Sequence, residues 1–343
     1  MVRDIIITSL SSGTLGEPFA RHELQRGLAR LAQRGLNVRF TDHALCGCGY
    51  LRAHPEARAA DLLQAFADPA AQMILCAIGG DDTYRLLPYL FGRGELQRAV
   101  RKKIFLGFSD TTVNHLMLHK VGLPTFYGQA FLPDVCELDR GMLPYTQRYF
   151  DELLRTGTIR EVRPSPVWYD SRSDFSPSAL DTAMPAHPDR GFVLLQGAPR
   201  FSGPILGGCI DTLYDLFNSD RYADSAALCQ KYMLFPTPDD WHGRILLLES
   251  SEEQPPPHKY RRMLAALREA GVFSAVAGIL VGKPMDEKYA AEYQSLLLEA
   301  VGDPSLPILY NVNVGHATPR CILPFGVPAQ VDAAAQRITF APA

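Results

Sequence analysis

The stretch Lys103-Ile-Phe-Leu-Gly-Phe-Ser-Asp-Thr-Thr112 joins a β-strand pattern directly to the start of a helix. Residues 103–108 form the apolar run of a buried strand, and residues 111–121 have a helical pattern. Strands that alternate with helices in this way predict a parallel sheet covered on both faces, so the sequence falls in the α/β class. The preceding chain repeats the alternation, with strands expected at 4–10, 37–41 and 73–78 and helices at 18–34, 57–66 and 83–90.

The length and charge of the chain limit its partners. Its 343 residues suggest two domains. Lys and Arg number 34 against 37 Asp and Glu, which excludes a general basic footprint for nucleic acid. No apolar run reaches the length of about 18 residues that a membrane-spanning helix needs. We therefore expect neither a nucleic acid nor a membrane as a partner.

The N-terminal residues and the cysteines predict a cytoplasmic location. Residues 1–8 carry one basic residue and a short apolar tract, a pattern typical of a first strand rather than of a secretion signal. Seven cysteines are scattered along the chain, and an odd number without a signal segment indicates free thiols in a reducing compartment.

The middle of the chain separates two structured halves. Residues 161–190 are rich in Pro, Ser and Asp and show little periodicity, and long loops of this kind are often functional. Strand and helix patterns return after this segment. The sequence thus predicts an N-terminal domain over 1–160, a linker and substrate loop over 161–195, and a C-terminal domain over 196–343.

Ser109 lies at the turn from the strand 103–108 into the helix that follows. A serine on such a turn is exposed at the edge of the sheet, beside backbone N–H groups and the positive end of the helix, as in a nucleophile elbow. The pattern Gly-x-Ser-x-Gly would require Gly at position 111, where Thr stands. The alternative is that Ser109 or Asp110 only caps the helix.

A nucleophilic serine requires a base, and the chain has nine histidines. His316 follows Gly315 in a loop after the strand expected at 308–314, where functional residues collect, although it can also be a turn histidine. His115 and His119 are four residues apart on one helix, but the sequence between them lacks the Glu of a zinc peptidase motif. Helix packing is the favoured interpretation of that pair.

An acidic group is also needed to orient the imidazole. Glu249 is the first polar residue after the apolar run 245–248, and its position at the end of a strand favours a site. Glu252 and Glu253 follow it, and for them a solvated acidic loop is the favoured interpretation. Gly79 and Gly80 lie at another strand-to-helix turn, where glycine allows close approach to a ligand or only a tight turn.

These motifs together resemble the LD-carboxypeptidase family of serine peptidases. The similarity extends over nearly the whole chain, and the middle loop with Trp168 and the later Leu195-Gln-Gly resemble the microcin C self-immunity (MccF-like) branch. The motifs are Gly-Gly-Asp-Asp-Thr-Tyr-Arg at 79–85, Gly-Phe-Ser-Asp at 107–110, Leu-Leu-Leu-Glu-Ser-Ser-Glu-Glu at 246–253 and Gly-His-Ala-Thr-Pro-Arg at 315–320.

The resemblance implies a fold and a set of catalytic residues. It implies a flavodoxin-like N-terminal domain, a C-terminal α/β domain with a mixed, partly barrel-like sheet, and a homodimer. The catalytic triad would be Ser109, Glu249 and His316, with an oxyanion hole formed by the backbone N–H groups of Asp110 and Gly80. Neither a metal nor another cofactor is expected.

The substrate is left open between two classes within the family. One is a microcin C-type peptidyl or aminoacyl nucleotide, which the aromatic Trp168 favours because a base offers a flat face for stacking. The other is a murein tetrapeptide that loses its terminal D-Ala. Gly79, Trp168 and Arg85 are the expected substrate contacts, and Arg262 and Arg320 are further candidate cations for a substrate carboxylate.

Two further points stay open. A non-catalytic cytoplasmic nucleotide-binding protein is the alternative from another functional class. The chain also departs from the family pattern at 207–210 and 218–222, near the expected cleft, and the role of the segment 223–241 is not assigned by the sequence.

Overall fold

The computed structural model describes residues 1–341, and its N-terminal part is built on a mostly parallel sheet. The order β2-β1-β3-β4-β5 is flavodoxin-like, and β14 joins it antiparallel to β5. In such sheets ligands bind beyond the carboxyl ends of the strands. The strands are β1 (Asp4–Thr8), β2 (Asn37–Phe40), β3 (Met73–Cys76), β4 (Ile104–Gly107), β5 (Thr125–Tyr127) and β14 (Leu323–Phe325).

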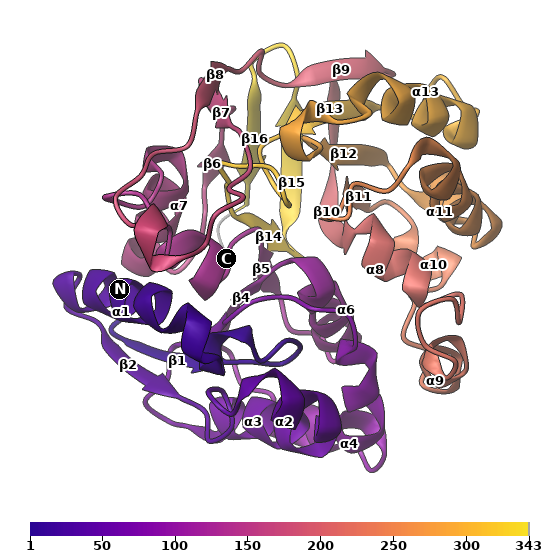
Figure 1. Ribbon diagram of the computed structural model, residues 1–343. Coiled ribbons are helices and arrows are strands. Elements are labelled where there is room, and N and C mark those ends of the chain that lie inside the picture. Colours follow the sequence, from indigo (N-terminus) through magenta and orange to yellow (C-terminus); the bar gives the residue numbers. More distant parts are fainter. Residues whose placement is uncertain (342–343) are drawn as a thin grey trace.

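Helices cover this sheet on both faces. The central strand β3 is fully buried, as expected for a parallel strand with helices on either side. Figure 1 shows α1 and α3 on opposite sides of β1 and β2. The helices of this part are α1 (Arg21–Gln33), α2 (Gly47–Ala53), α3 (Pro55–Ala67), α4 (Leu87–Phe91), α5 (Glu95–Ala99), α6 (Thr112–Lys120) and α7 (Pro144–Thr156).

A mixed eight-stranded sheet forms the C-terminal part. Its order is β6-β16-β15-β10-β11-β12-β13-β9, in which β10 to β13 are parallel and the flanking strands are antiparallel. The predicted α/β fold, parallel in the N-terminal part and mixed in the C-terminal part, is confirmed. The strands are β6 (Glu161–Val162), β9 (Val193–Gln196), β10 (Arg200–Cys209), β11 (Ile245–Glu249), β12 (Gly278–Gly282), β13 (Ile308–Val312), β15 (Pro328–Asp332) and β16 (Arg337–Phe340).

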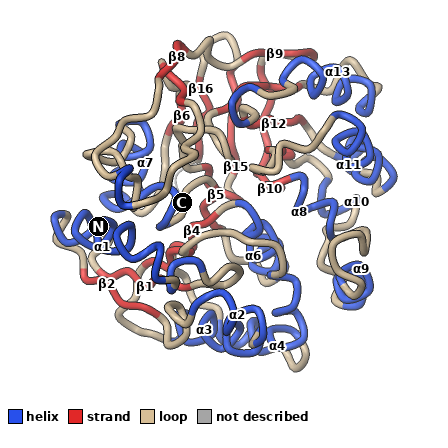
Figure 2. The backbone as a smooth tube through the Cα atoms, viewed as in Figure 1, coloured by secondary structure: helices blue, strands red, loops and turns tan. Residues whose placement is uncertain are grey.

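Helices pack along one side of this second sheet, and short strands lie in the middle segment. Figure 2 shows long stretches of loop between the elements of the middle segment. There β7 (Val167–Tyr169) and β8 (Ala186–Pro188) form a hairpin, and Tyr169 bridges to Thr318. The helices are α8 (Ile210–Asp215), α9 (Ser225–Lys231), α10 (Pro238–Trp241), α11 (Pro257–Glu269), α12 (Val272–Ala275) and α13 (Ala290–Val301).

The two sheets meet at β10, a strand that the sequence pattern did not predict. Its glycines and Pro204 weaken a strand signal, because glycine offers no side chain to pack. The same glycines permit a close approach: a Cβ added to Gly208 would lie 2.9 Å from the ring of Tyr127 on β5. The backbone N–H of Cys209 also donates to Thr112 Oγ1 of α6 at 3.0 Å. The end of β10 therefore joins the two parts of the chain.

Within residues 1–341, no helix has both the length and the apolar character needed to cross a membrane.

Candidate active site

Ser109 lies on a strained turn between β4 and α6. Its φ is 65°, a left-handed value that is uncommon for a residue with a side chain and that is typical of functional turns. Gly79 faces it so closely that a Cβ there would lie 2.6 Å from Cβ of Ser109. No side chain caps α6, so the capping alternative is wrong and the hydroxyl of Ser109 is available for another partner.

That partner is His316, which Glu249 holds from the other side. Nε2 of His316 lies 3.0 Å from Oγ of Ser109, and Nδ1 lies 2.7 Å from Oε2 of Glu249. Glu249 ends β11, and His316 lies in the loop after β13. Three side chains separated by up to 207 positions thus form one hydrogen-bonded chain.

A second carboxylate reaches the same imidazole. Oε2 of Glu252 lies 2.9 Å from Nε2 of His316. Burial opposes charge on this ring, yet the carboxylates of Glu249 and Glu252 outweigh burial and raise the pKa of His316 to about 10. The hydrogen bond to His316 lowers the pKa of Glu252 to about 2. Glu252 is solvent-exposed, as expected for a solvated acidic loop, but its carboxylate also contacts the imidazole, which the sequence did not predict.

Tyr127 of β5 connects Glu249 to the turn of Ser109. Its hydroxyl donates to Oε1 of Glu249 at 2.6 Å and accepts the backbone N–H of Ser109 at 3.2 Å. Burial and the nearby negative charge of Glu249 raise the pKa of Tyr127 well above its ordinary value, so the phenol stays protonated and remains a donor. The sequence analysis did not single out this residue, which resembles any core tyrosine of a short strand.

The loop of His316 is fixed by a glycine and an arginine. Gly315 has a φ of 93°, and a Cβ there would lie 2.6 Å from Cβ of Glu249. The guanidinium of Arg320 donates to the carbonyls of Gly315 and His316 and pairs with Asp134 at 3.0 Å. Arg320 is 6% exposed and paired with Asp134, so it is not a free cation for a substrate carboxylate.

Asp110 and Gly80 lie side by side at the ends of β4 and β3. Oδ2 of Asp110 accepts hydrogen bonds from Ser11 Oγ at 2.5 Å and from the backbone and hydroxyl of Thr83 at 3.0 and 2.6 Å. A Cβ on Gly80 would lie 2.8 Å from the backbone nitrogen of Ser12. Both turns are therefore held firmly next to Ser109 by contacts between the ends of β1, β3 and β4.

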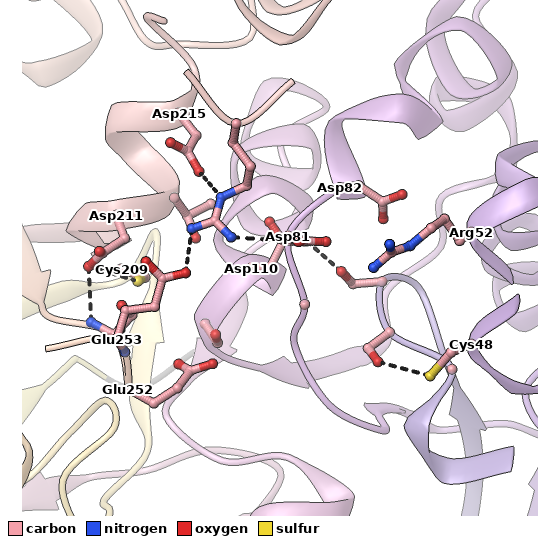
Figure 3. Close-up of a pocket in the computed structure, with 18 residues that line it drawn as sticks. Cys48, Arg52, Asp81, Asp82, Asp110, Cys209, Asp211, Asp215, Glu252 and Glu253 are labelled. Carbon is pink, nitrogen blue, oxygen red and sulfur yellow. Dashed lines mark hydrogen bonds and ion pairs between the residues drawn. The ribbon is translucent and has the colours of Figure 1, made fainter. Parts of the chain in front are cut away.

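A cavity of about 240 Å³ opens in front of Ser109. Figure 3 shows that acidic side chains dominate one end of this cavity, whereas Arg52 and Cys48 lie at the other. Part of this lining comes from the motifs at 79–85, 107–110 and 246–253 and from the departures at 207–210 and 218–222. Sequence reasoning missed other lining residues because they belong to no motif, namely Arg52, Asp211, Thr212 and Asp215.

The three predicted substrate contacts, Gly79, Trp168 and Arg85, lie outside the lining of this cavity. Trp168 stacks on His187 with ring centres 4.4 Å apart. The guanidinium carbon of Arg85 lies 4.8 Å from the ring centre of Tyr222. Arg262 pairs with the exposed Asp220 at 2.9 Å. The structure therefore brings Ser109, Asp110 and Gly80 to the cavity, but neither Trp168 nor Arg85.

Two groups of possible metal ligands occur within residues 1–341. His115 is buried, with Nδ1 2.7 Å from Thr125 Oγ1, and burial lowers its pKa to about 4, which fits its expected packing role. Donor atoms of Cys209, Glu249 and His316 lie within 4.8 Å of one another. Burial, together with the nearby carboxylates, raises the pKa of Cys209 well above its ordinary value. This thiol stays protonated, and Glu249 and His316 are already paired.

Sequence models of protein families match both halves of this chain. The LD-carboxypeptidase N-terminal domain matches residues 5–128, and the LD-carboxypeptidase C-terminal domain matches residues 202–331. The chain belongs to the LD-carboxypeptidase family. The resemblance found in the sequence is thereby confirmed, and the chain is a serine-type carboxypeptidase rather than a non-catalytic binding protein.

Individual members of the LD-carboxypeptidase family extend this result. An MccF-like protein from Streptococcus pneumoniae, solved in complex with AMP, is 58% identical, with a TM-score of 0.98 and 99% of each chain covered. The murein tetrapeptide carboxypeptidase of Pseudomonas aeruginosa is 33% identical over 90% of this chain and 88% of its own. The microcin C7 self-immunity protein MccF of Escherichia coli is 25% identical over 80% and 75%. Resemblance to the MccF-like branch is thus confirmed.

Proposed function

We propose that the chain hydrolyses an amide bond with Ser109 as nucleophile, His316 as general base and Glu249 as the orienting carboxylate. The hydrogen-bonded chain from Ser109 through His316 to Glu249, at 3.0 and 2.7 Å, carries this proposal. Such distances allow proton transfer from the hydroxyl to the imidazole. The left-handed turn that presents Ser109 at the cavity further supports it.

The reaction follows from this geometry. His316 takes the proton of Ser109 as its oxygen attacks the substrate carbonyl, and Glu249 stabilises the imidazolium that forms. The backbone N–H groups of Asp110 and Gly80 would hold the oxyanion. His316 then protonates the leaving nitrogen, and a water molecule activated by the same imidazole releases the acyl group from Ser109.

For the substrate we propose an aminoacyl or peptidyl nucleotide of the microcin C type. Support comes from the MccF-like relative, which is 58% identical and was solved with AMP. The scissile bond would be the amide between an aspartyl carbonyl and the nitrogen of a sulfamoyl or phosphoramide adenylate. Hydrolysis of this bond separates the amino acid from the nucleotide.

A murein tetrapeptide is the second candidate substrate. It is favoured by the relative from Pseudomonas aeruginosa, a murein tetrapeptide carboxypeptidase that covers 90% of this chain. In that reaction the same serine would release the terminal D-Ala.

The test is a direct comparison of the two substrates with the purified chain. Aspartyl sulfamoyl adenosine and a murein tetrapeptide are incubated in parallel, with Ser109→Ala as the blank, and products are quantified by mass spectrometry. We expect release of aspartate and sulfamoyl adenosine by the unmodified chain. Release of D-Ala alone would reject the nucleotide substrate, and turnover of neither would reject both. We also propose the homodimer implied by the family, which light scattering tests.

A further inference from the structure

Charged side chains are distributed unequally around the cavity in front of Ser109. Asp211, Asp215, Glu252 and Glu253 gather at one end, on α8 and on the loop that follows β11 (Figure 3). Arg52 lies at the opposite end. A substrate in this cavity meets several carboxylates at one side, and the contacts of these carboxylates decide which group they can bind.

One arginine serves three of the acidic groups. Arg221 lies 3.1 Å from Asp215, 2.5 Å from Glu253 and 3.6 Å from Asp81. With Lys259, Arg221 brings two positive charges to four carboxylates, so this wall stays negative. Burial raises the pKa of Asp215 to about 6 even though Arg221 is adjacent, which indicates incomplete compensation of its charge.

Asp211 has an oxygen atom with no hydrogen-bond partner among residues 1–341. The side chain is 5% exposed, and its Oδ2 accepts the backbone N–H of Ser251 at 3.0 Å. Its Oδ1 accepts no hydrogen bond in that part of the chain. The ammonium of Lys259 lies 3.9 Å from Oδ1, beyond hydrogen-bond distance, and bonds instead to Glu253 at 3.2 Å. A buried carboxylate oxygen without a donor is costly, so a donor from a ligand would be favourable.

We propose that Asp211 and Asp215 form a subsite for a primary ammonium group of the substrate, next to Ser109. This inference rests on the proposed hydrolase function. An ammonium is compact, carries one positive charge and offers three donors, which matches an unpartnered oxygen beside a second carboxylate. A divalent cation fits less well, because its double charge meets twice the repulsion from Arg221 and Lys259 and because it needs several oxygen ligands.

The subsite selects substrates by their free amine. An aminoacyl nucleotide carries its α-ammonium within a few bonds of the carbonyl that Ser109 would attack, so one molecule can reach both positions. A substrate without this amine would leave Oδ1 of Asp211 unpartnered in the complex.

The test compares two ligands that differ only in this amine. Aspartyl sulfamoyl adenosine and its desamino analogue, succinyl sulfamoyl adenosine, are titrated by calorimetry at pH 7 into the Ser109→Ala variant, which keeps the cavity but not the nucleophile. We expect the desamino analogue to bind about 10- to 100-fold more weakly, as for loss of a hydrogen bond to a charged group. Introducing Asp211→Asn into this variant should reduce that ratio to about threefold or less.

Two further variants make the result specific. Asp220→Asn, which alters an exposed aspartate outside the cavity lining, should leave the ratio unchanged. Asp215→Asn is measured in the same way, and it carries the test if thermal melting shows that Asp211→Asn does not fold.

Equal affinity of the two ligands for the Ser109→Ala variant would overturn the subsite. An affinity ratio that stays the same in folded Asp211→Asn and Asp215→Asn proteins would also overturn it. The same holds if the two ligands bind alike and the cavity instead binds Ca²⁺ or Mg²⁺ in a way that Asp211→Asn abolishes. Failure of the hydrolase proposal is separate: it would show as no turnover by the unmodified chain, whatever the binding ratio.

Discussion

The carboxylate of Glu252 lies 2.9 Å from Nε2 of His316, the same nitrogen that faces the hydroxyl of Ser109. The contact favours the protonated imidazole, and the pKa of His316 rises to about 10 because the carboxylates outweigh burial. A protonated imidazole cannot accept the proton of Ser109. Glu249 and Glu252 together therefore favour the charged imidazole, and a rise in pH or loss of the Glu252 charge would favour the neutral base.

Glu252→Gln should shift the acid limb of the pH–rate profile. Activity requires neutral His316, so kcat/KM falls as pH drops below the pKa of this base. Removal of the negative charge of Glu252 lowers that pKa, and the limb should move to lower pH by about one unit or more. The measurement is kcat/KM for aspartyl sulfamoyl adenosine across the pH range.

The matched control for this substitution is Glu299→Gln. Glu299 is a surface residue that pairs with Arg261, and its replacement should leave the profile in place. An acid limb at the same pH in the chain with Glu252→Gln and in the unmodified chain would show that Glu252 does not control His316.

Gly315→Ala should reduce both activity and stability. The added methyl group meets Glu249, and the left-handed backbone at Gly315 disfavours any side chain by about 1–2 kcal/mol. Gly302 also has a positive φ, but a Cβ there would meet only a carbonyl oxygen at 3.9 Å. Gly302→Ala should therefore lower the free energy of unfolding by about 1 kcal/mol while kcat is retained. Equal kcat in the two variants would show that activity does not require Glu249 to pack on Gly315.

Tyr127→Phe should lower kcat by about tenfold with little change in KM. The substitution removes a donor to Glu249 and an acceptor for the backbone of Ser109, and a hydrogen bond to a charged group contributes about 1.5 kcal/mol or more. Tyr145→Phe removes another buried hydroxyl, one that donates to the carbonyl of Arg163 at 2.5 Å, and should keep kcat. If both variants lose activity alike, the effect belongs to core packing.

The positions of Ser109, Glu249 and His316 could be predicted because each follows an apolar strand. Parallel strands bring their carboxyl ends to one edge, so polar residues just beyond those ends are good candidates for a site. Strands with continuous apolar runs were predicted to within a few residues, as at β3 (Met73–Cys76) and β11 (Ile245–Glu249).

Other features had no local signal. Glu252 lies in an acidic run that resembles solvated surface, and only the fold places its carboxylate on His316. The strand β10 was missed because it contains Pro204 and several glycines, residues that strands usually avoid, although Gly208 permits the contact between the two sheets. Arg221 and Asp211 acquire their meaning from ion pairs between distant segments, and no spacing in the sequence reveals these.

The central claim, that Ser109 and His316 act as one unit, is tested most directly by comparing Ser109→Ala, His316→Ala and the double variant on aspartyl sulfamoyl adenosine. When two residues act as one unit, removing either one removes the contribution of both to kcat. Each single variant should therefore lose at least about 10⁴-fold in kcat, and the double variant should lose no more than either single variant. A folded Ser109→Ala protein with near-normal kcat, or losses that multiply in the double variant, would contradict the account.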